Sequence, residues 1–206
     1  MTKQYNSPTF PPKGPWDARL EGPACTELTP VEEIHSNPWF AVNERGSFFT
    51  IEYHQPQVIV LPVLENHSFI MVRPYRPVVK DSPLEFPAGA VEKREKPVEG
   101  AMRELAEESG IQIDSSRFVT MAPLALSPNR TPKLTYIFRV DVRQQEYDER
   151  GDFDNEIEAI EVISLREAAE AVVSGGIYIS IPVAIIGMYL LERSLLGIDW
   201  KNKDSA

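Results

Sequence analysis

The segment from Gly89 to Ile111, GAVEKREKPVEGAMRELAEESGI, constrains the fold of this chain more than any other stretch. Pro97 suits the first turn of a helix and Gly110 suits its C-terminal end, so the spacing predicts a helix over about 97–109. At about 100° per residue, the apolar side chains of this helix fall on one face, which predicts packing against a sheet. These side chains are Val98, Ala101, Met102 and Leu105.

A second face of the same helix is acidic. Glu104 and Glu108 lie one turn apart, so their carboxylates point the same way and can hold one hard cation through oxygen ligands. Arg103 precedes Glu107 by four residues and can hold that carboxylate in place. The pattern predicts a helix that packs with one face and binds a divalent cation with another. An ordinary solvated acidic face is the alternative.

The same segment matches every specified position of the Nudix box, G-x5-E-x7-R-E-U-x-E-E-x-G-U, where U is an aliphatic residue. The matching residues are Gly89, Glu95, Arg103, Glu104, Leu105, Glu107, Glu108, Gly110 and Ile111. The chain therefore resembles the Nudix hydrolases, over about residues 38–198. The resemblance implies an α/β/α sandwich with a mixed β-sheet that holds Mg2+, with Mn2+ as an alternative. It also implies hydrolysis of a pyrophosphate bond.

The resemblance assigns roles within the box by position. Glu104 and Glu108 are implied to be metal ligands, together with the backbone carbonyl of Ala88. Glu107 is implied to belong to the catalytic group as a further ligand or as an acceptor beside the ligands. The implied structural members are Gly89, Glu95, Arg103 and Gly110. A bound divalent cation would neutralise the charge of a pyrophosphate and lower the pKa of bound water.

Two stretches before the box narrow the resemblance to one branch of the family. EFPAG at 85–89 and MVRPYRP at 71–77 resemble segments of the ADP-ribose and nucleotide-sugar pyrophosphatases. By position, Arg76 is implied to contact a substrate phosphate, and Glu85 to bind substrate or order the site. Arg73 is a further substrate-binding candidate. An exposed arginine on an edge strand is the alternative for Arg76.

A turn after the box bears on the substrate. Ser127-Pro128-Asn129-Arg130 lies where ADP-ribose hydrolases show Ser-Pro-Gly, so Pro128 is a substrate-binding candidate. Asn129 departs from that pattern, although Asn also tolerates a left-handed turn. An ordinary hairpin turn is the alternative.

The catalytic base is expected in the acidic loop GDFDNEIE at 151–158. In the branch that the chain resembles, this later loop supplies the group that activates water. Glu156 is the expected base and Asp154 the other member of the acidic pair, with Glu158 as a substitute. Without the box, this loop would be interpreted as an acidic surface loop.

Aromatic residues before the box are candidates for stacking on a nucleobase. Trp39, Phe40, Phe48 and Phe49 lie in predicted strands, and similar enzymes use such residues in this way, often across a dimer interface. Packing in the core is the alternative. A homodimer is expected.

Composition excludes several classes of protein. The 206 residues carry a formal net charge of -10, with no basic run, which argues against a nucleic-acid partner. The N-terminal segment has no apolar core of a signal peptide, and no stretch reaches the ~20 apolar residues of a membrane span. Cys25 is the only cysteine. We therefore expect a cytoplasmic protein with no membrane partner.

The pattern predicts three parts: an extended Pro-rich arm at 1–37 anchored by Trp16, a Nudix domain at 38–198, and a tail at 199–206. Within the domain, mixed α/β structure is expected. Strands are predicted at 39–42, 47–54, 57–64, 68–75, 83–89, 118–126, 133–142 and 159–164. Beyond the helix over 97–109, one helix is predicted from the capping box at Ser164 to Gly175 and another from about Ser180.

The expected reaction is Mg2+-dependent cleavage of ADP-ribose or a related nucleoside diphosphate sugar into a nucleoside monophosphate and a sugar phosphate. One alternative is another nucleoside diphosphate derivative, such as GDP-mannose or UDP-glucose. The other is a regulator that binds ADP-ribose without cleaving it. The intact set of box glutamates favours an enzyme.

Overall fold

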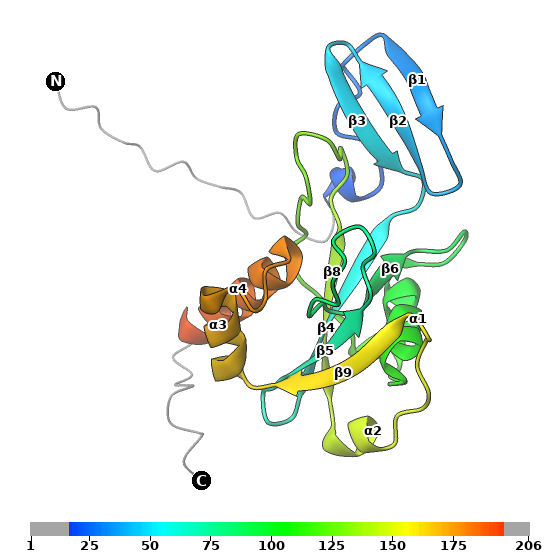
Figure 1. Cartoon of the computed structure of the whole chain (residues 1–206). Coiled ribbons are helices and arrows are strands. Elements are labelled where there is room, and N and C mark those ends of the chain that lie inside the picture. The colour runs from blue at the N-terminus through cyan, green and yellow to red at the C-terminus, as the bar shows by residue number, and fades with distance from the viewer. Residues whose placement is uncertain (1–16, 196–206) are drawn as a thin grey trace, which may run out of the picture.

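The computed structural model describes residues 17–195, in which a small sheet stands at one end of a larger layered part (Figure 1). The small sheet is antiparallel and contains β1 (Val31–Ser36), β2 (Phe40–Arg45) and β3 (Phe48–Tyr53). Trp16 and the tail at 199–206 lie outside the described residues, so the predictions for them stay untested.

The larger sheet is built around β4 (Gln57–Leu64). This strand pairs in parallel with β8 (Tyr136–Val142) and antiparallel with β5 (Phe69–Pro74) and β6 (Ala88–Ala90). Two further strands extend the sheet at its edges, β9 (Ile157–Ile163) beside β5 and β7 (Val119–Thr120) beside β8. The predicted mixed sheet is confirmed.

Helices cover both faces of this sheet (Figure 1). On β4, Val58 and Val60 face the core that contains Leu105 of α1 (Pro97–Ser109). Ile59 and Leu61 face the opposite core. That second core contains residues of α3 (Leu165–Ser174) and α4 (Ser180–Leu195). Burial on both faces explains why β4 reads as a continuous apolar run, and the predicted α/β/α sandwich is confirmed.

The helix predictions rest on end signals that the structure bears out. Pro97 is the first residue of α1, and Gly110 follows its end in the left-handed region. At α3, the Ser164 side chain accepts the Glu167 N–H at 3.2 Å, and the Glu167 carboxylate accepts the Ser164 N–H at 2.8 Å. None of the helices within residues 17–195 is long and apolar enough to cross a membrane.

The first described residues are more structured than the expected extended arm. β1 pairs with β2 although all six of its side chains are exposed. Its sequence, VEEIHS, lacks the apolar alternation that marks a half-buried strand, so backbone pairing alone defines it. Upstream, η1 (Ala18–Leu20) places Leu20 in the core beside α1, with 1% of its surface exposed. The prediction that strands begin at Trp39 was wrong.

Three other predicted elements differ in extent. The strand expected at 118–126 is reduced to β7 and a bridge between Leu124 and Thr135, because Pro123 lacks the N–H that a ladder needs. The strand expected at 83–89 becomes a bridge at Glu85 followed by β6. The strand expected at 159–164 begins earlier, at Ile157 of β9. A short helix that was not predicted, α2 (Gln144–Asp148), precedes the acidic loop.

The two glycines that end α1 and α3 provide a matched test of this packing. Gly110 and Gly175 have φ angles of +70° and +82°. A Cβ on Gly110 would overlap the carbonyl oxygen of Gly151, whereas one on Gly175 meets nothing within 4 Å. Left-handed backbone costs about 1–2 kcal/mol without glycine, and overpacking adds about 1–3 kcal/mol. Urea unfolding should therefore show a loss of about 1 kcal/mol for Gly175→Ala and about 3 kcal/mol for Gly110→Ala. Equal losses would contradict the packing argument.

Candidate active site

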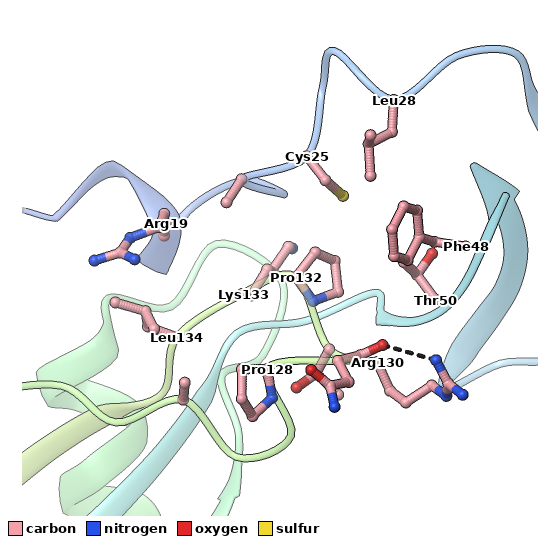
Figure 2. A pocket seen from close by; sticks show the side chains of 14 residues that line it. Arg19, Cys25, Leu28, Phe48, Thr50, Pro128, Arg130, Pro132, Lys133 and Leu134 are labelled. Carbon is pink, nitrogen blue, oxygen red and sulfur yellow. Dashed lines mark hydrogen bonds between the residues drawn. The ribbon is translucent and has the colours of Figure 1, made fainter. Parts of the chain in front are cut away.

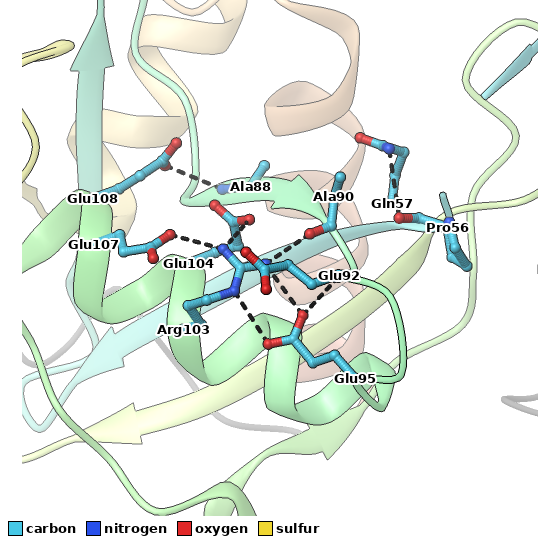
Figure 3. A network of polar contacts seen from close by, with 10 residues as sticks. All are labelled: Pro56, Gln57, Ala88, Ala90, Glu92, Glu95, Arg103, Glu104, Glu107 and Glu108. Atoms are coloured by element: carbon cyan, nitrogen blue, oxygen red, sulfur yellow. Dashed lines mark hydrogen bonds and ion pairs between the residues drawn. The ribbon is translucent and has the colours of Figure 1, made fainter. Parts of the chain in front are cut away.

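Arg103 joins the loop before α1 to the helix itself (Figure 3). Its Nε donates to Glu95 at 3.1 Å, and its Nη1 donates to Glu104 at 2.8 Å and to Glu107 at 2.7 Å. Its Nη2 donates to the carbonyl of Ala90 at 2.7 Å. Burial lowers the pKa of Arg103, but the hydrogen bonds with Glu95 and Glu104 more than offset this and hold it above its ordinary value. One guanidinium thus orders three box glutamates.

Gly89 leaves room for the carboxylate of Glu104. A Cβ at position 89 would overlap this carboxylate, which lies against β6. Glu104 is only 8% exposed, and burial raises its pKa despite the hydrogen bond from Arg103. A glycine is therefore required at the start of the box, because β6 and α1 approach each other closely there.

Glu108 lies one turn after Glu104 and accepts the backbone N–H of Ala88 at 3.1 Å (Figure 3). Burial raises the pKa of Glu108 to about 8, and the charge of Glu104 acts in the same direction. The charged forms of these two carboxylates are therefore disfavoured by their surroundings. A divalent cation with oxygen ligands would supply the missing charge, so the residues fit Mg2+ or Mn2+.

Within residues 17–195, no three His, Cys, Asp or Glu side chains are arranged to hold a metal ion as they stand. Arg103 engages oxygen atoms of both Glu104 and Glu107. A cation would share these carboxylates with the arginine. The ligand roles predicted for these glutamates and for the carbonyl of Ala88 stay predictions.

Arg76 lies near the box carboxylates and is oriented by Glu85. Its Nε and Nη2 donate to the two carboxylate oxygens of Glu85 at 3.0 and 2.8 Å. This hydrogen bonding raises the pKa of Arg76, and the negative charges of Glu108 and Glu156 add to the effect. The remaining guanidinium N–H groups can meet an anion. The structure therefore brings together two predicted substrate-binding residues, the box and the later acidic loop.

Arg73 is engaged differently. Its Nε pairs with Glu161 on β9, and its Nη1 donates to the carbonyl of Ser82 at 2.8 Å. Both partners belong to the protein framework beside the site, so the predicted contact of Arg73 with substrate gains no support from this geometry.

The acidic loop at 151–156 lies against the C-terminal end of α1. The Gly151 N–H donates to the carbonyl of Gly110 at 2.9 Å, and the Asp154 N–H donates to the carbonyl of Glu107 at 2.8 Å. Asp154 and Glu156 are exposed. These contacts explain why Gly110 must lack a side chain, and they bring the candidate bases to the box.

The three candidate bases differ in their partners. The carboxylate of Glu158 accepts the hydroxyl of Ser82 at 2.6 Å. Glu156 lies close enough to Arg76 to raise its pKa, whereas Asp154 is fixed through its backbone. Sequence reasoning missed Ser82, because nothing in the local pattern links it to a residue so far along the chain.

Pro128 lies apart from the box carboxylates. It lines a cavity of about 600 Å³ between the small sheet and the loop at 125–134 (Figure 2). Phe48 lines the same cavity, as do Cys25, Arg130 and Lys133. No box residue lines it. Within one chain, the structure does not join Pro128 to the carboxylate site.

The other aromatic candidates divide between packing and exposure. Phe40 packs edge-on against Tyr53, with ring centroids 6.2 Å apart. Trp39 and Phe49 are 72% and 49% exposed. These two side chains are therefore accessible to a nucleobase or to a second protein chain.

Comparison with known proteins agrees with this site. The family model for the NUDIX domain matches residues 53–179. A methanol dehydrogenase activator of Bacillus methanolicus is 28% identical over 154 residues, which cover 74% of this chain and 82% of that protein. An ADP-ribose pyrophosphatase of Bacillus subtilis (strain 168) is 30% identical over 137 residues, which cover 66% and 72%.

A solved structure supports the same fold. The crystal structure of an ADP compounds hydrolase has a TM-score of 0.65 at 17% identity, and the match covers 87% of this chain and 98% of that one. At this identity the match establishes architecture alone. The family model, however, spans more than half of the chain and includes the whole box. This chain belongs to the NUDIX domain family and is a Nudix hydrolase of the pyrophosphatase type.

Proposed function

We propose that this protein hydrolyses the pyrophosphate bond of ADP-ribose or a related nucleoside diphosphate sugar, with Mg2+ as its cation and Mn2+ as an alternative. The observation that carries the proposal is that Arg76, held by two hydrogen bonds to Glu85, lies close enough to Glu108 of the Nudix helix for their charges to interact. A pyrophosphate diester has negative charge on both phosphates. It needs cationic donors on one side and a carboxylate-bound metal on the other.

The residues divide the work as follows. A divalent cation held by Glu104 and Glu108 supplies charge neutralisation and a water of lowered pKa when bound. Arg76, oriented by Glu85, binds a phosphate through its free N–H groups. Glu156 accepts the proton of the attacking water. The new bond forms between the water oxygen and phosphorus, and the bond from phosphorus to the bridging oxygen breaks. The products are a nucleoside monophosphate and a sugar phosphate.

Two features support ADP-ribose or a related nucleoside diphosphate sugar as the substrate. The segment EFPAG precedes the box, as in the nucleotide-sugar branch. The relative from Bacillus subtilis, which is 30% identical to this chain, is named an ADP-ribose pyrophosphatase.

A substrate panel tests the proposal directly. ADP-ribose, ADP-glucose, GDP-mannose, UDP-glucose and dGTP are each incubated with excess Mg2+, and the monophosphate products are separated by chromatography. We expect ADP-ribose to give the highest kcat/KM and a chelator to abolish turnover. A preference for GDP-mannose or UDP-glucose would show that adenine is not the preferred base. Binding of ADP-ribose without turnover would favour a regulator.

Two glutamate variants should fail in different ways. Glu108→Gln removes a proposed metal ligand, so titration with Mn2+ should show weakened metal binding together with loss of most turnover. Glu156→Gln removes the proposed base, so kcat should fall by about 10²–10⁴-fold while metal binding stays normal. Each variant serves as the control for the other. If Asp154→Asn or Glu158→Gln gives the loss of kcat instead, the base is misassigned.

We also propose a homodimer that uses the small sheet. Among residues 17–195, six of the fifteen exposed large apolar side chains lie between residues 31 and 53. They are Val31, Ile34, Trp39, Phe48, Phe49 and Tyr53. Such clustering is typical of an association surface, and a two-fold dimer is the commonest assembly.

Light scattering tests the dimer. The protein should have twice its chain mass of 23.3 kDa. The double variant Trp39→Asp/Phe49→Asp should shift the mass to that of one chain, because charge would enter the proposed interface. Val173→Asp changes a valine on α3 that is 89% exposed and should leave the dimer intact. A monomeric wild-type protein would contradict the proposal.

A further inference from the structure

Arg76 and Glu85 lie at the two ends of a loop at residues 75–85, here called the Arg76 loop. The loop is closed by its own backbone: the Arg76 N–H donates to the carbonyl of Asp81 and the Lys80 N–H donates to the carbonyl of Arg76, both at 2.8 Å. The Glu85 N–H and carbonyl bond to Val72 of β5, each at 2.9 Å. The loop therefore carries the Arg76–Glu85 pair as one unit.

Side chains from two distant segments hold the outer part of this loop. The hydroxyl of Ser82 donates to Glu158 of β9 at 2.6 Å. The hydroxyl of Tyr178, between α3 and α4, donates to the carboxylate of Asp81 at 2.7 Å. Arg73 of β5 supports the same place by donating to the carbonyl of Ser82. Hydrogen bonds to ionised carboxylates are stronger than neutral ones, which suits a tether at the surface.

The tethers join the Arg76 loop to the segment that carries the candidate bases. Glu156 and Glu158 flank Ile157, which is 5% exposed and fixes the start of β9. The carbonyl of Glu156 also accepts the Tyr75 N–H, at 3.3 Å. A displacement of the Arg76 loop would therefore change the distance between Arg76 and the box.

We propose that Ser82 and Tyr178 are positioning residues, which hold the Arg76 loop so that Arg76 and Glu85 meet the phosphates of the substrate. This inference rests on the proposed function. Ser82 also gives Glu158 a tethering role, which leaves Glu156 free to accept the proton. Both hydroxyls donate to carboxylates of the protein, so in this proposal both act through Arg76.

The physical consequence is a selective effect on binding. Tyr178 is 48% exposed, Asp81 is exposed and Ser82 is half-buried, so water can replace the lost hydrogen bonds at little cost to folding. Contacts of Arg76 with a phosphate stabilise substrate and transition state alike. Loss of such uniform binding raises KM and leaves kcat unchanged.

The test compares Ser82→Ala, Tyr178→Phe and their combination with the wild-type enzyme. The double variant should raise KM for the best substrate of the panel about fivefold while kcat stays within about twofold. Hydrogen exchange at the amides of Arg76 and Lys80 should become about tenfold faster, because the loop opens more often. The single variant Ser82→Thr keeps the hydroxyl, so its KM and its exchange rate at Arg76 and Lys80 should equal those of the wild-type enzyme.

A control uses a serine at another place in the fold. Ser174→Ala removes a hydroxyl that bonds only within the end of α3, to the carbonyl of Ala171, and should change neither KM nor exchange in the loop. Unchanged exchange in the double variant would overturn the inference. Faster exchange with a normal KM would also overturn the inference, because the hydroxyls would then hold the loop without affecting substrate binding.

The same measurements distinguish failure of the positioning role from failure of the proposed function. A wild-type protein that cleaves the panel while the double variant keeps its KM refutes the positioning role alone. A wild-type protein with no turnover refutes the proposed function, and hydrogen exchange then decides whether the tethers hold the loop. A fall in kcat instead of a rise in KM would assign Glu158 to the chemistry and contradict its role as a tether.

Discussion

The ion-pair network of Arg103 is the interaction on which the site depends. A helix that carries Glu104, Glu107 and Glu108 on its polar side is weakened by repulsion between like charges. Arg103 offsets this repulsion and ties the helix to Glu95 in the preceding loop. The remaining imbalance falls on Glu108, whose pKa is raised by burial and which has no ion pair with another residue of 17–195. The same set of charges thus orders the helix and underlies the proposal that the site binds a divalent cation.

The surrounding fold brings three separate segments to this helix. Gly89 lets β6 approach Glu104, Gly110 lets the acidic loop approach the helix end, and the Arg76 loop supplies positive charge opposite Glu108. Two of these approaches need the absence of a Cβ, which is a steric requirement and not a chemical one. The box therefore encodes packing between segments as well as the proposed metal ligands.

Much of the fold was predictable from the sequence, because residues close together in the chain specify where the helices begin and end. The ends of α1 follow from Pro97 and Gly110, and the capping box at Ser164 marks the start of α3. By contrast, β1 has no apolar alternation, and Pro123 cut short a strand that the apolar pattern favoured. Pro128, predicted near the substrate, lies in a cavity that contains no box residue. Its position depends on how the loop at 125–134 packs against the small sheet, which no local pattern specifies.

The sequence by itself determined the fold class, the box and which carboxylates lie together on one helix, because spacing along a helix fixes which side chains share a face. Only the tertiary structure decided which distant residues act on them. Arg76 meets the charges of Glu108 and Glu156, Ser82 engages Glu158, and Tyr178 reaches Asp81. Such pairs depend on strand order and loop packing, and contacts between segments far apart in the chain leave no periodic signal in the sequence.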